Sequence, residues 1–278
     1  YNNMKTILVP VDFSETSDNA LEYALGLANY LTANIILLHV DALPLVNNEF
    51  QDLSAAVQKS KEAYVELLSK KADAIKIDHP TRNVDYYYEV GNFQSIVNSL
   101  VFEKAIDIIV MGISGHGKKL SKVILGSNAV NLSRECEVPV IIVPPHYKYR
   151  RIKNIAYASQ YDESVKETTG LIKVKHLNTR FDSTLNVLHV LPDNHMINQS
   201  EAETDLYIEQ KLENTKHRTY NLWAAKASEA LLEFINNHDI DAVIVEQKKH
   251  SIFYKIFHQS TTNELAFNSP IPVLSIKG

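Results

Sequence analysis

The chain of 278 residues is predicted to be an α/β protein built from two tandem doubly wound domains. Short apolar runs alternate with amphipathic stretches along the whole chain, and the same order of runs occurs twice. Continuous apolar strands separated by helices indicate a parallel sheet with helices on both faces, because such strands are buried on both sides. We therefore expect five parallel strands in each half, with domains at residues 1–147 and 148–278.

The first half gives the clearer pattern of elements. Alanine and leucine recur at near-3.6 spacing between residues 20 and 31, which is typical of the buried face of a helix. The strands are expected at residues 5–11, 35–40, 84–90, 106–111 and 139–143. The helices between them are expected at residues 17–31, 52–73, 93–104 and 127–135.

The second half repeats the first. Leu-His-Val at 38–40 returns at 188–190, and Val-Pro-Val at 138–140 returns as Ile-Pro-Val at 271–273. The repeated strands are expected at residues 154–158, 184–190, 218–223, 241–246 and 271–276. The aromatic residues on or beside strands are expected to pack in the core: Tyr86, Tyr87, Tyr88 and Trp223.

The last strand of each half is apolar and carries few charges. An unpaired apolar edge of this kind invites association with another strand. We therefore expect the two halves to form an intrachain pseudo-dimer about a pseudo-twofold axis, with these two edges paired. Whether whole chains also form a homodimer stays open.

Bulk composition limits the class of protein. The net charge of −5 and the pI near 6.1 argue against a nucleic-acid partner, which a basic face would attract. No apolar run approaches the ~20 residues that a membrane span needs, and no signal peptide is visible. The single Cys136 excludes an intrachain disulfide and fits a reducing compartment. We expect a cytoplasmic protein that binds neither nucleic acid nor membrane.

Glycine is concentrated in one segment. The chain has 8 Gly, and four of them fall within residues 112–126: Gly112, Gly115, Gly117 and Gly126. An apolar run precedes this segment and a helical pattern follows it. A strand, a glycine loop and a helix N-terminus together present backbone N–H groups to an anion. The pattern favours phosphate binding, and a sharp turn without a ligand is the alternative.

The glycine segment nearly matches a P-loop and departs from that motif in two respects. Lys119 stands where Mg²⁺ needs a Ser or Thr hydroxyl, and a helix starting at Lys118 would place Gly126 in its interior. We expect the helix to begin at Gly126-Ser127, with Ser127 as N-cap and anion contact.

Two further residues follow predicted strands. Asp12 stands after the first strand, where its carboxylate can bind a ribose or base, help hold a metal, or cap the next helix with Ser14 and Ser17. Val40 ends the second strand, as a wall of the same crevice or as ordinary core. In an open α/β sheet, ligands bind beyond such strand ends.

Taken together, these motifs resemble the universal stress protein family. The resemblance rests on Pro-Val-Asp-Phe-Ser at 10–14, Leu-His-Val at 38–40, Met-Gly-x-x-Gly at 111–115, Gly-Ser at 126–127 and Val-Pro-Val at 138–140. It covers nearly the whole chain as a tandem pair of domains. It implies a strand order of 3-2-1-4-5 in each domain and, in one branch, an ATP site with a Gly-x2-Gly-x9-Gly-Ser/Thr loop.

The resemblance also implies a set of nucleotide-binding residues: Pro10, Asp12, Val40, Met111, Gly112, Gly115, Gly117, Gly126, Ser127 and Asn128. By matching position, Asp12 and Val40 flank the adenosine, Met111 and Gly112 lie near the ribose and adenine, and the later residues hold the phosphates. Ten residues rather than nine separate Gly115 from Gly126. Either the loop carries one extra residue, or Gly117 takes over one glycine role. The implied ligand is ATP, with or without Mg²⁺.

The corresponding positions of the second half differ. Glu246 stands where Gly112 stood, Gln160 replaces Asp12, and His258 stands near the position of Gly126. Side chains thus replace the glycines, so we expect this site to be degenerate.

The sequence therefore predicts a cytoplasmic ATP-binding stress-response or regulatory protein, with the ligand in the N-terminal domain only. Catalytic residues and a resident metal are not expected: no Ser-His-Asp or Cys-His arrangement and no zinc spacing stands out. Any enzymatic activity would be at most that of a slow ATPase. The alternative is an interaction module that keeps the fold for dimerisation and binds no nucleotide.

Overall fold

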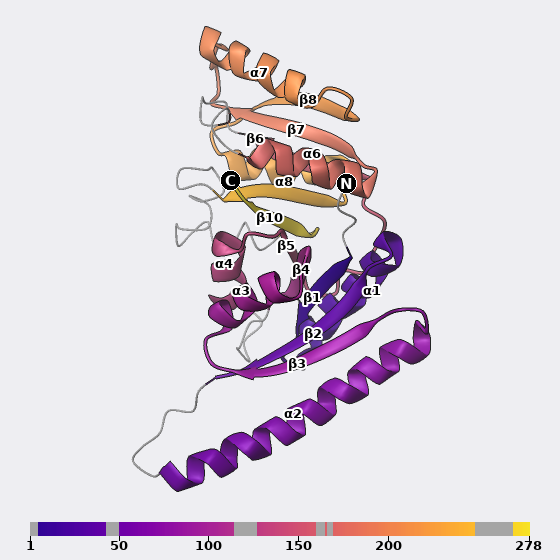
Figure 1. Cartoon of the computed structure of the whole chain (residues 1–278). Coiled ribbons are helices and arrows are strands. Elements are labelled where there is room, and N and C mark those ends of the chain that lie inside the picture. The colour runs from indigo at the N-terminus through magenta and orange to yellow at the C-terminus, as the bar shows by residue number, and fades with distance from the viewer. Residues whose placement is uncertain (1–4, 43–49, 114–126, 160–164, 166–168, 248–268) are drawn as a thin grey trace.

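The computed structural model describes residues 5–42, 50–113, 127–159, 165, 169–247 and 269–278. Its strands form one ten-stranded sheet (Figure 1). The strands are β1 (Thr6–Pro10), β2 (Asn34–Asp41), β3 (Val84–Val90), β4 (Ile108–Gly112), β5 (Val140–Val143), β6 (Asn154–Ser159), β7 (Thr184–Leu191), β8 (His217–Trp223), β9 (Ala242–Gln247) and β10 (Val273–Lys277).

The strand order across the sheet is β3-β2-β1-β4-β5-β10-β9-β6-β7-β8. Each half thus has the order 3-2-1-4-5, and all pairings within a half are parallel. This arrangement confirms the predicted fold class.

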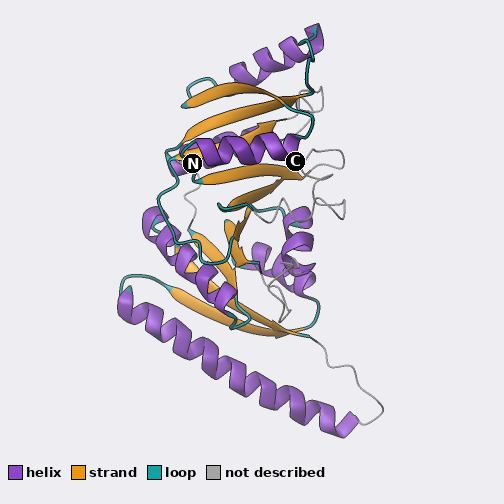
Figure 2. Cartoon of the chain, turned by 180° about the vertical axis from the view of Figure 1, so that it is seen from behind, coloured by secondary structure: helices purple, strands orange, loops and turns teal. Residues whose placement is uncertain are grey.

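Helices cover both faces of the sheet (Figure 2). Those described are α1 (Glu15–Leu31), α2 (Phe50–Asp78), α3 (Phe93–Glu103), α4 (Ser127–Glu135), α6 (Gly170–Phe181), α7 (Gln199–Lys211) and α8 (Ala227–Asn237). Core residues of α1, α2, α6 and α7 pack on one face, and those of α3, α4 and α8 pack on the other. The sheet is therefore the middle layer of three.

Alternation along the strands explains this layering. In β1, Ile7 and Val9 join the core beneath α1, whereas Leu8 joins the core on the opposite face. Helix α1 begins at Glu15, two residues before its predicted start, because the Ser14 hydroxyl caps it by accepting a hydrogen bond from the Ser17 amide at 3.2 Å. Helix α2 begins two residues before its predicted start and ends five after its predicted end.

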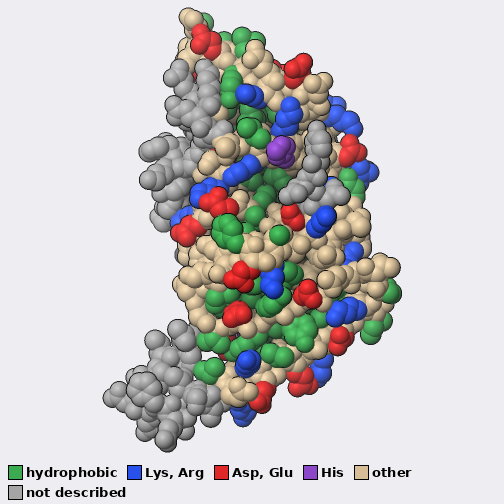
Figure 3. Space-filling view, in the orientation of Figure 1, with side chains coloured by type: hydrophobic (Ala, Val, Ile, Leu, Met, Phe, Trp, Pro, Cys, Tyr) green, Lys and Arg blue, Asp and Glu red, His purple; other side chains and the backbone are tan. Residues whose placement is uncertain are grey.

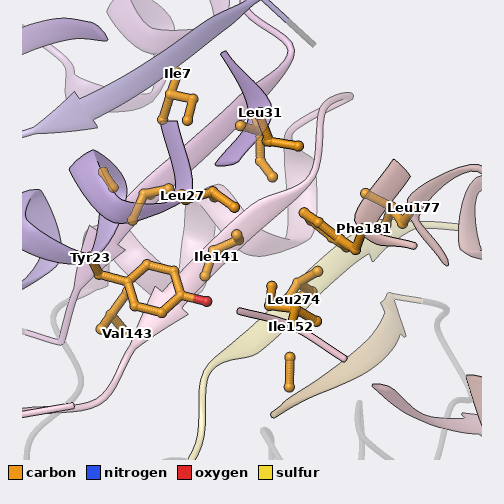
Figure 4. Packing of buried hydrophobic residues seen from close by; sticks show 14 of the residues in the cluster. Ile7, Tyr23, Leu27, Leu31, Ile141, Val143, Ile152, Leu177, Phe181 and Leu274 are labelled. Atoms are coloured by element: carbon orange, nitrogen blue, oxygen red, sulfur yellow. The ribbon is translucent and has the colours of Figure 1, made fainter. Parts of the chain in front are cut away.

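The two halves meet through their last strands. β5 and β10 are antiparallel, with Ile141 opposite Leu274, which is the edge pairing that their apolar sequences predict. One buried cluster continues across this junction, from Leu27 of α1 to Phe181 of α6 (Figure 4). The strand order is palindromic about the β5–β10 pair, as a pseudo-twofold axis at this point requires.

The segment between β5 and β6 is fixed to both halves. The ring of Tyr149 lies directly against Gly26 of α1, where any side chain would overlap it. The Arg150 Nε lies 2.9 Å from the buried Asp241 carboxylate, and its guanidinium also donates to the Ile240 carbonyl at 2.9 Å. The connection is therefore part of the packed structure.

The surface carries charges of both signs. Figure 3 shows Lys and Arg interspersed with Asp and Glu over the described part of one face. None of the described helices combines the length and the apolar character that crossing a membrane requires.

One predicted core residue is exposed instead. The side chain of Trp223 is 52% accessible, and its indole N–H donates to the His195 carbonyl at 3.3 Å. The prediction failed because β8 is the terminal strand of the sheet and Trp223 is its last residue. Tyr86, Tyr87 and Tyr88 of β3 are half-buried.

Candidate functional site

The carboxyl ends of β1, β2 and β4 lie side by side. Strand β1 is paired with β2 on one side and with β4 on the other. Pro10 lies opposite Leu38, so Asp12 and Val40 follow at the same edge, and Gly112 ends β4 at that edge too. Five predicted site residues, Met111 included, are therefore neighbours at the edge where open α/β sheets bind ligands.

Asp12 lies exposed in the turn between β1 and α1. Its Oδ1 accepts hydrogen bonds from the Ser14 amide at 3.1 Å and from the Ser14 hydroxyl at 2.5 Å. The Ser14 hydroxyl in turn lies 3.0 Å from that of Thr16. The helix cap therefore belongs to Ser14, and the Asp12 carboxylate is oriented by the turn.

Gly112 is required by packing. A Cβ at this position would overlap the backbone carbonyl of Thr16 in the first turn of α1. The missing side chain allows α1 to approach the end of β4 closely. The sequence pattern predicted a ligand contact or a sharp turn for this glycine, and the packing against Thr16 was not predicted, because the position of Thr16 cannot be read from spacing.

Val40 and Met111 lie on the other face of the sheet. Both pack against the core beneath α3 and α4, and Met111 is 7% exposed. Helix α4 begins on this face at Ser127, as predicted, with Asn128 exposed in its first turn. The N-terminus of a helix carries a partial positive charge and free N–H groups, which favour an anion.

Three predicted residues, Gly115, Gly117 and Gly126, lie outside the described residues, as do Gln160 and His258 in the second half. Within the described ranges, no three side chains from His, Cys, Asp and Glu are grouped so that they could hold a metal ion.

The second half has a different residue at the position of Gly112. Ile7 pairs with Ile108 as Ile155 pairs with Ala242, so Glu246 corresponds to Gly112. The Glu246 side chain is 6% exposed, and its Oε2 accepts a hydrogen bond from the Tyr157 hydroxyl at 3.0 Å.

The Glu246 carboxylate lies against the start of α6. A Cβ at Gly170 would overlap it. The first half therefore has its glycine on the strand and the second half has it on the helix.

Sequence reasoning missed one group beside the site. Phe13, His39, Tyr64 and Tyr88 form an aromatic cluster on the α1 and α2 face. The Leu-His-Val motif at 38–40 marks the repeat and contributes to the family resemblance, and neither observation assigns His39 a role at the site. The recurrence of histidine at 189 was the available signal that this position has a role beyond core packing.

The doubly wound sheet with helices on both faces places the chain in the class of open α/β proteins. The universal stress protein family profile matches residues 3–144, and the chain belongs to this family.

Relatives match one half or the whole chain. Universal stress protein MJ0577 of Methanocaldococcus jannaschii is 30% identical over 154 residues, covering 50% of this chain and 94% of its own length. Universal stress protein Slr1230 of Synechocystis is 23% identical over 296 residues, covering 99% of this chain and 100% of its own. The crystal structure of a universal stress protein from Archaeoglobus fulgidus has the same fold, with a TM-score of 0.66 at 18% identity over 98% of this chain and 96% of that one.

Proposed function

We propose that the chain is a cytoplasmic stress-response or regulatory protein that binds ATP in its first half only. One observation carries the proposal: the ends of β1, β2 and β4 are neighbours, and the segment from β4 to α4 contains three further glycines. Membership of the universal stress protein family supports it, because one branch of that family has such a site. The buried free thiol of Cys136 supports a reducing compartment.

The residues around the site suit the parts of an adenine nucleotide. Val40 and Met111 offer apolar surface to a base, and the exposed Asp12 carboxylate offers an acceptor to ribose hydroxyls. The amino end of α4 offers backbone N–H groups and a partial positive charge to phosphates. Mg²⁺, when bound, would neutralise part of the phosphate charge.

The second half is proposed to bind no nucleotide. In support, Glu246 carries a carboxylate at the strand end where the first half has Gly112. An anionic side chain near this edge disfavours an anionic ligand by like-charge repulsion. The Tyr157 hydroxyl and the packing against Gly170 hold Glu246 in place.

A thermal-shift titration tests the proposed function. ATP at ~100 times its dissociation constant should add ~2.7 kcal/mol to the free energy of unfolding. The titration should compare ATP with and without Mg²⁺, GTP and inorganic triphosphate. Only a site that also binds the base stabilises the protein more with ATP than with inorganic triphosphate. An unchanged melting temperature at millimolar ATP with Mg²⁺ would favour the alternative, an interaction module that binds no nucleotide.

A further inference from the structure

An aromatic cluster joins the β1–α1 turn to the long helix α2. It is formed by Phe13 of the turn, His39 of β2, Tyr64 of α2 and Tyr88 of β3. Tyr64 lies at its centre: its ring centroid is 4.1 Å from His39, 5.7 Å from Phe13 and 6.1 Å from Tyr88. The Phe13 and Tyr88 rings stack on it with interplanar angles of 17°. The β1–α1 turn therefore contacts α2 through the stacked rings of Phe13 and Tyr64.

The backbone of Phe13 is strained. Its φ is 61°, in the left-handed region that costs a bulky residue roughly a factor of ten in population. The stack with Tyr64 and His39 favours this conformation, because Phe13 makes these ring contacts from it. Ring contacts from two other elements, β2 and α2, therefore favour a conformation that Phe13 would rarely adopt alone.

His39 fixes the turn from the other side. Its Nδ1–H donates to the Val11 carbonyl at 2.7 Å, and the Val11 amide donates to the Leu38 carbonyl at 2.8 Å. Asp12 stands between these two fixed residues, Val11 and Phe13. The position of its carboxylate therefore depends on the His39 hydrogen bond and on the Phe13 backbone.

We infer that Phe13, His39 and Tyr64 are positioning residues, which hold Asp12 ready for the ligand and couple occupancy of the site to the docking of α2. The inference rests on the proposed function and goes beyond it, since these three side chains lie on the α1 and α2 face whereas Val40 and Met111 lie on the other. A ligand bound to Asp12 stabilises the strained conformation of the β1–α1 turn. This conformation places the Phe13 ring against Tyr64, and the stacked rings hold α2 against the sheet.

Coupling of this kind is reciprocal. If docked α2 raises the affinity for the ligand by some factor, the ligand must stabilise docked α2 by the same factor. Couplings of about fivefold to 150-fold are typical of proteins, and a factor of about ten is expected here. The coupling factor can therefore be measured in two independent ways, from ATP affinity and from amide exchange in α2.

The experiment compares three variants of the full-length chain. Tyr64→Ala removes the central ring, Tyr64→Phe keeps it, and Tyr86→Ala is the matched control. Tyr86 lies on the same strand and packs against the same core as Tyr88, and the ring stack does not include it. ATP affinity is measured by calorimetry, and amide hydrogen exchange is followed with and without ATP.

The inference predicts that Tyr64→Ala weakens ATP binding about tenfold, while Tyr64→Phe and Tyr86→Ala stay within about twofold of wild type. In wild type, ATP should slow amide exchange in residues 57–68 of α2 by a similar factor. Without ATP, the Phe13 and Ser14 amides should exchange faster in Tyr64→Ala than in Tyr86→Ala.

Failure of the inference and failure of the proposed function are distinguishable. Unchanged ATP affinity in Tyr64→Ala, with wild type binding normally, overturns the inference and leaves the proposed function intact. Absence of ATP binding by wild type removes the proposed function and the coupling together. Equal exchange of the turn amides in Tyr64→Ala and Tyr86→Ala overturns the positioning role whether or not ATP binds.

Discussion

The amino ends of the strands are alike in the two halves, and the carboxyl ends differ. Asp107 accepts hydrogen bonds from the amides of Lys5 and Thr6 at 2.7 and 3.0 Å. Asp241 repeats this arrangement with the amides of Lys153 and Asn154, at 2.8 and 2.9 Å. At the opposite edge, Gly112 in one half corresponds to Glu246 in the other.

This comparison separates contacts that stabilise the fold, at the amino ends of the strands, from residues that determine ligand binding, at the carboxyl ends. The aspartates tie the start of the first strand of each half to its fourth strand, and both halves need that tie. The carboxyl edge differs without loss of the fold. In the first half, Gly112 lets the backbone of α1 approach the strand end, and in the second half Gly170 leaves room for the Glu246 side chain.

The helices next to the outermost strands, α2 and α7, are also attached differently in the two halves. Tyr64 attaches α2 through stacked rings, whereas α7 presents a carboxylate on every fourth residue to a histidine. The pairs are His195–Glu201 at 2.9 Å, His189–Asp205 at 3.6 Å and His217–Glu209 at 2.8 Å. We therefore expect pH to affect the stability of the second half through His189, which faces α7.

The largest expected effect comes from the glycine that precedes α4. Gly126→Val should weaken ATP binding about 100-fold or more, because a branched side chain blocks backbone N–H groups whose hydrogen bonds to phosphate are worth roughly 1.5–3 kcal/mol each. His258→Val, near the corresponding position of the second half, should leave affinity unchanged. Calorimetric titration measures both, and equal losses would contradict the asymmetry.

A second pair of variants tests the packing around Gly112 and Gly170. Gly112→Ala should lower the free energy of unfolding by about 3 kcal/mol, because its Cβ meets backbone of α1. Gly170→Ala should cost about 1 kcal/mol, because its Cβ meets the end of the Glu246 side chain, which can move. Urea unfolding measures both. The explanation is wrong if Gly170→Ala proves the more damaging.

The third prediction concerns His189. Burial lowers the pKa of its imidazole from about 6.5 to about 3, although Glu209 acts in the opposite direction. As pH falls below 6.5 the unfolded chain gains a proton here and the folded chain does not, so stability is lost. Between pH 7 and pH 5 the loss from this group is about 2 kcal/mol.

His189→Gln should therefore lose about 2 kcal/mol less than wild type between these two pH values. The exposed His176→Gln serves as the control and should follow wild type. Urea unfolding at both pH values gives the comparison. Parallel pH profiles for wild type and His189→Gln would show that this histidine does not set the acid sensitivity.

The smallest effects on the free energy of unfolding are expected from removing the hydroxyls of two buried tyrosines, Tyr23 and Tyr157. Only the second removal should be destabilising. The Tyr23 hydroxyl is buried with no hydrogen-bond partner among the described residues, whereas that of Tyr157 donates to Glu246. Tyr23→Phe should leave stability unchanged or raise it by up to about 1 kcal/mol, and Tyr157→Phe should lower it by about 1 kcal/mol. Loss of stability in both variants would mean that Tyr23 has an unrecognised partner.

Sequence alone predicted the strands and their pairing. Apolar runs such as residues 106–111 mark strands buried on both faces, and the apolar edges of β5 and β10 predicted their pairing. The exposure of Trp223 was not predictable in the same way. Aromatic residues suit strands generally, and only the position of β8 in the sheet leaves Trp223 accessible.

The candidate site was predictable where motif and strand end coincide, as at Asp12 and Val40. The packing role of Gly112 was not, because it depends on Thr16, which is remote in sequence and close in space. The aromatic cluster around Tyr64 combines side chains from four separate segments. One of them, Phe13, has a positive φ, which is rare for phenylalanine and cannot be predicted from the residue type. Residue patterns encode local structure well, whereas such contacts between remote elements require the fold.

The central claim is that one half of the chain holds a nucleotide and the other does not. Titration of the full-length protein with ATP in a calorimeter, at known active concentration, tests this directly through the stoichiometry. The account predicts one ATP per chain, with that binding abolished by Gly126→Val and retained by His258→Val. Two ATP per chain would contradict the asymmetry of the halves, and no binding at all would contradict the proposed function itself.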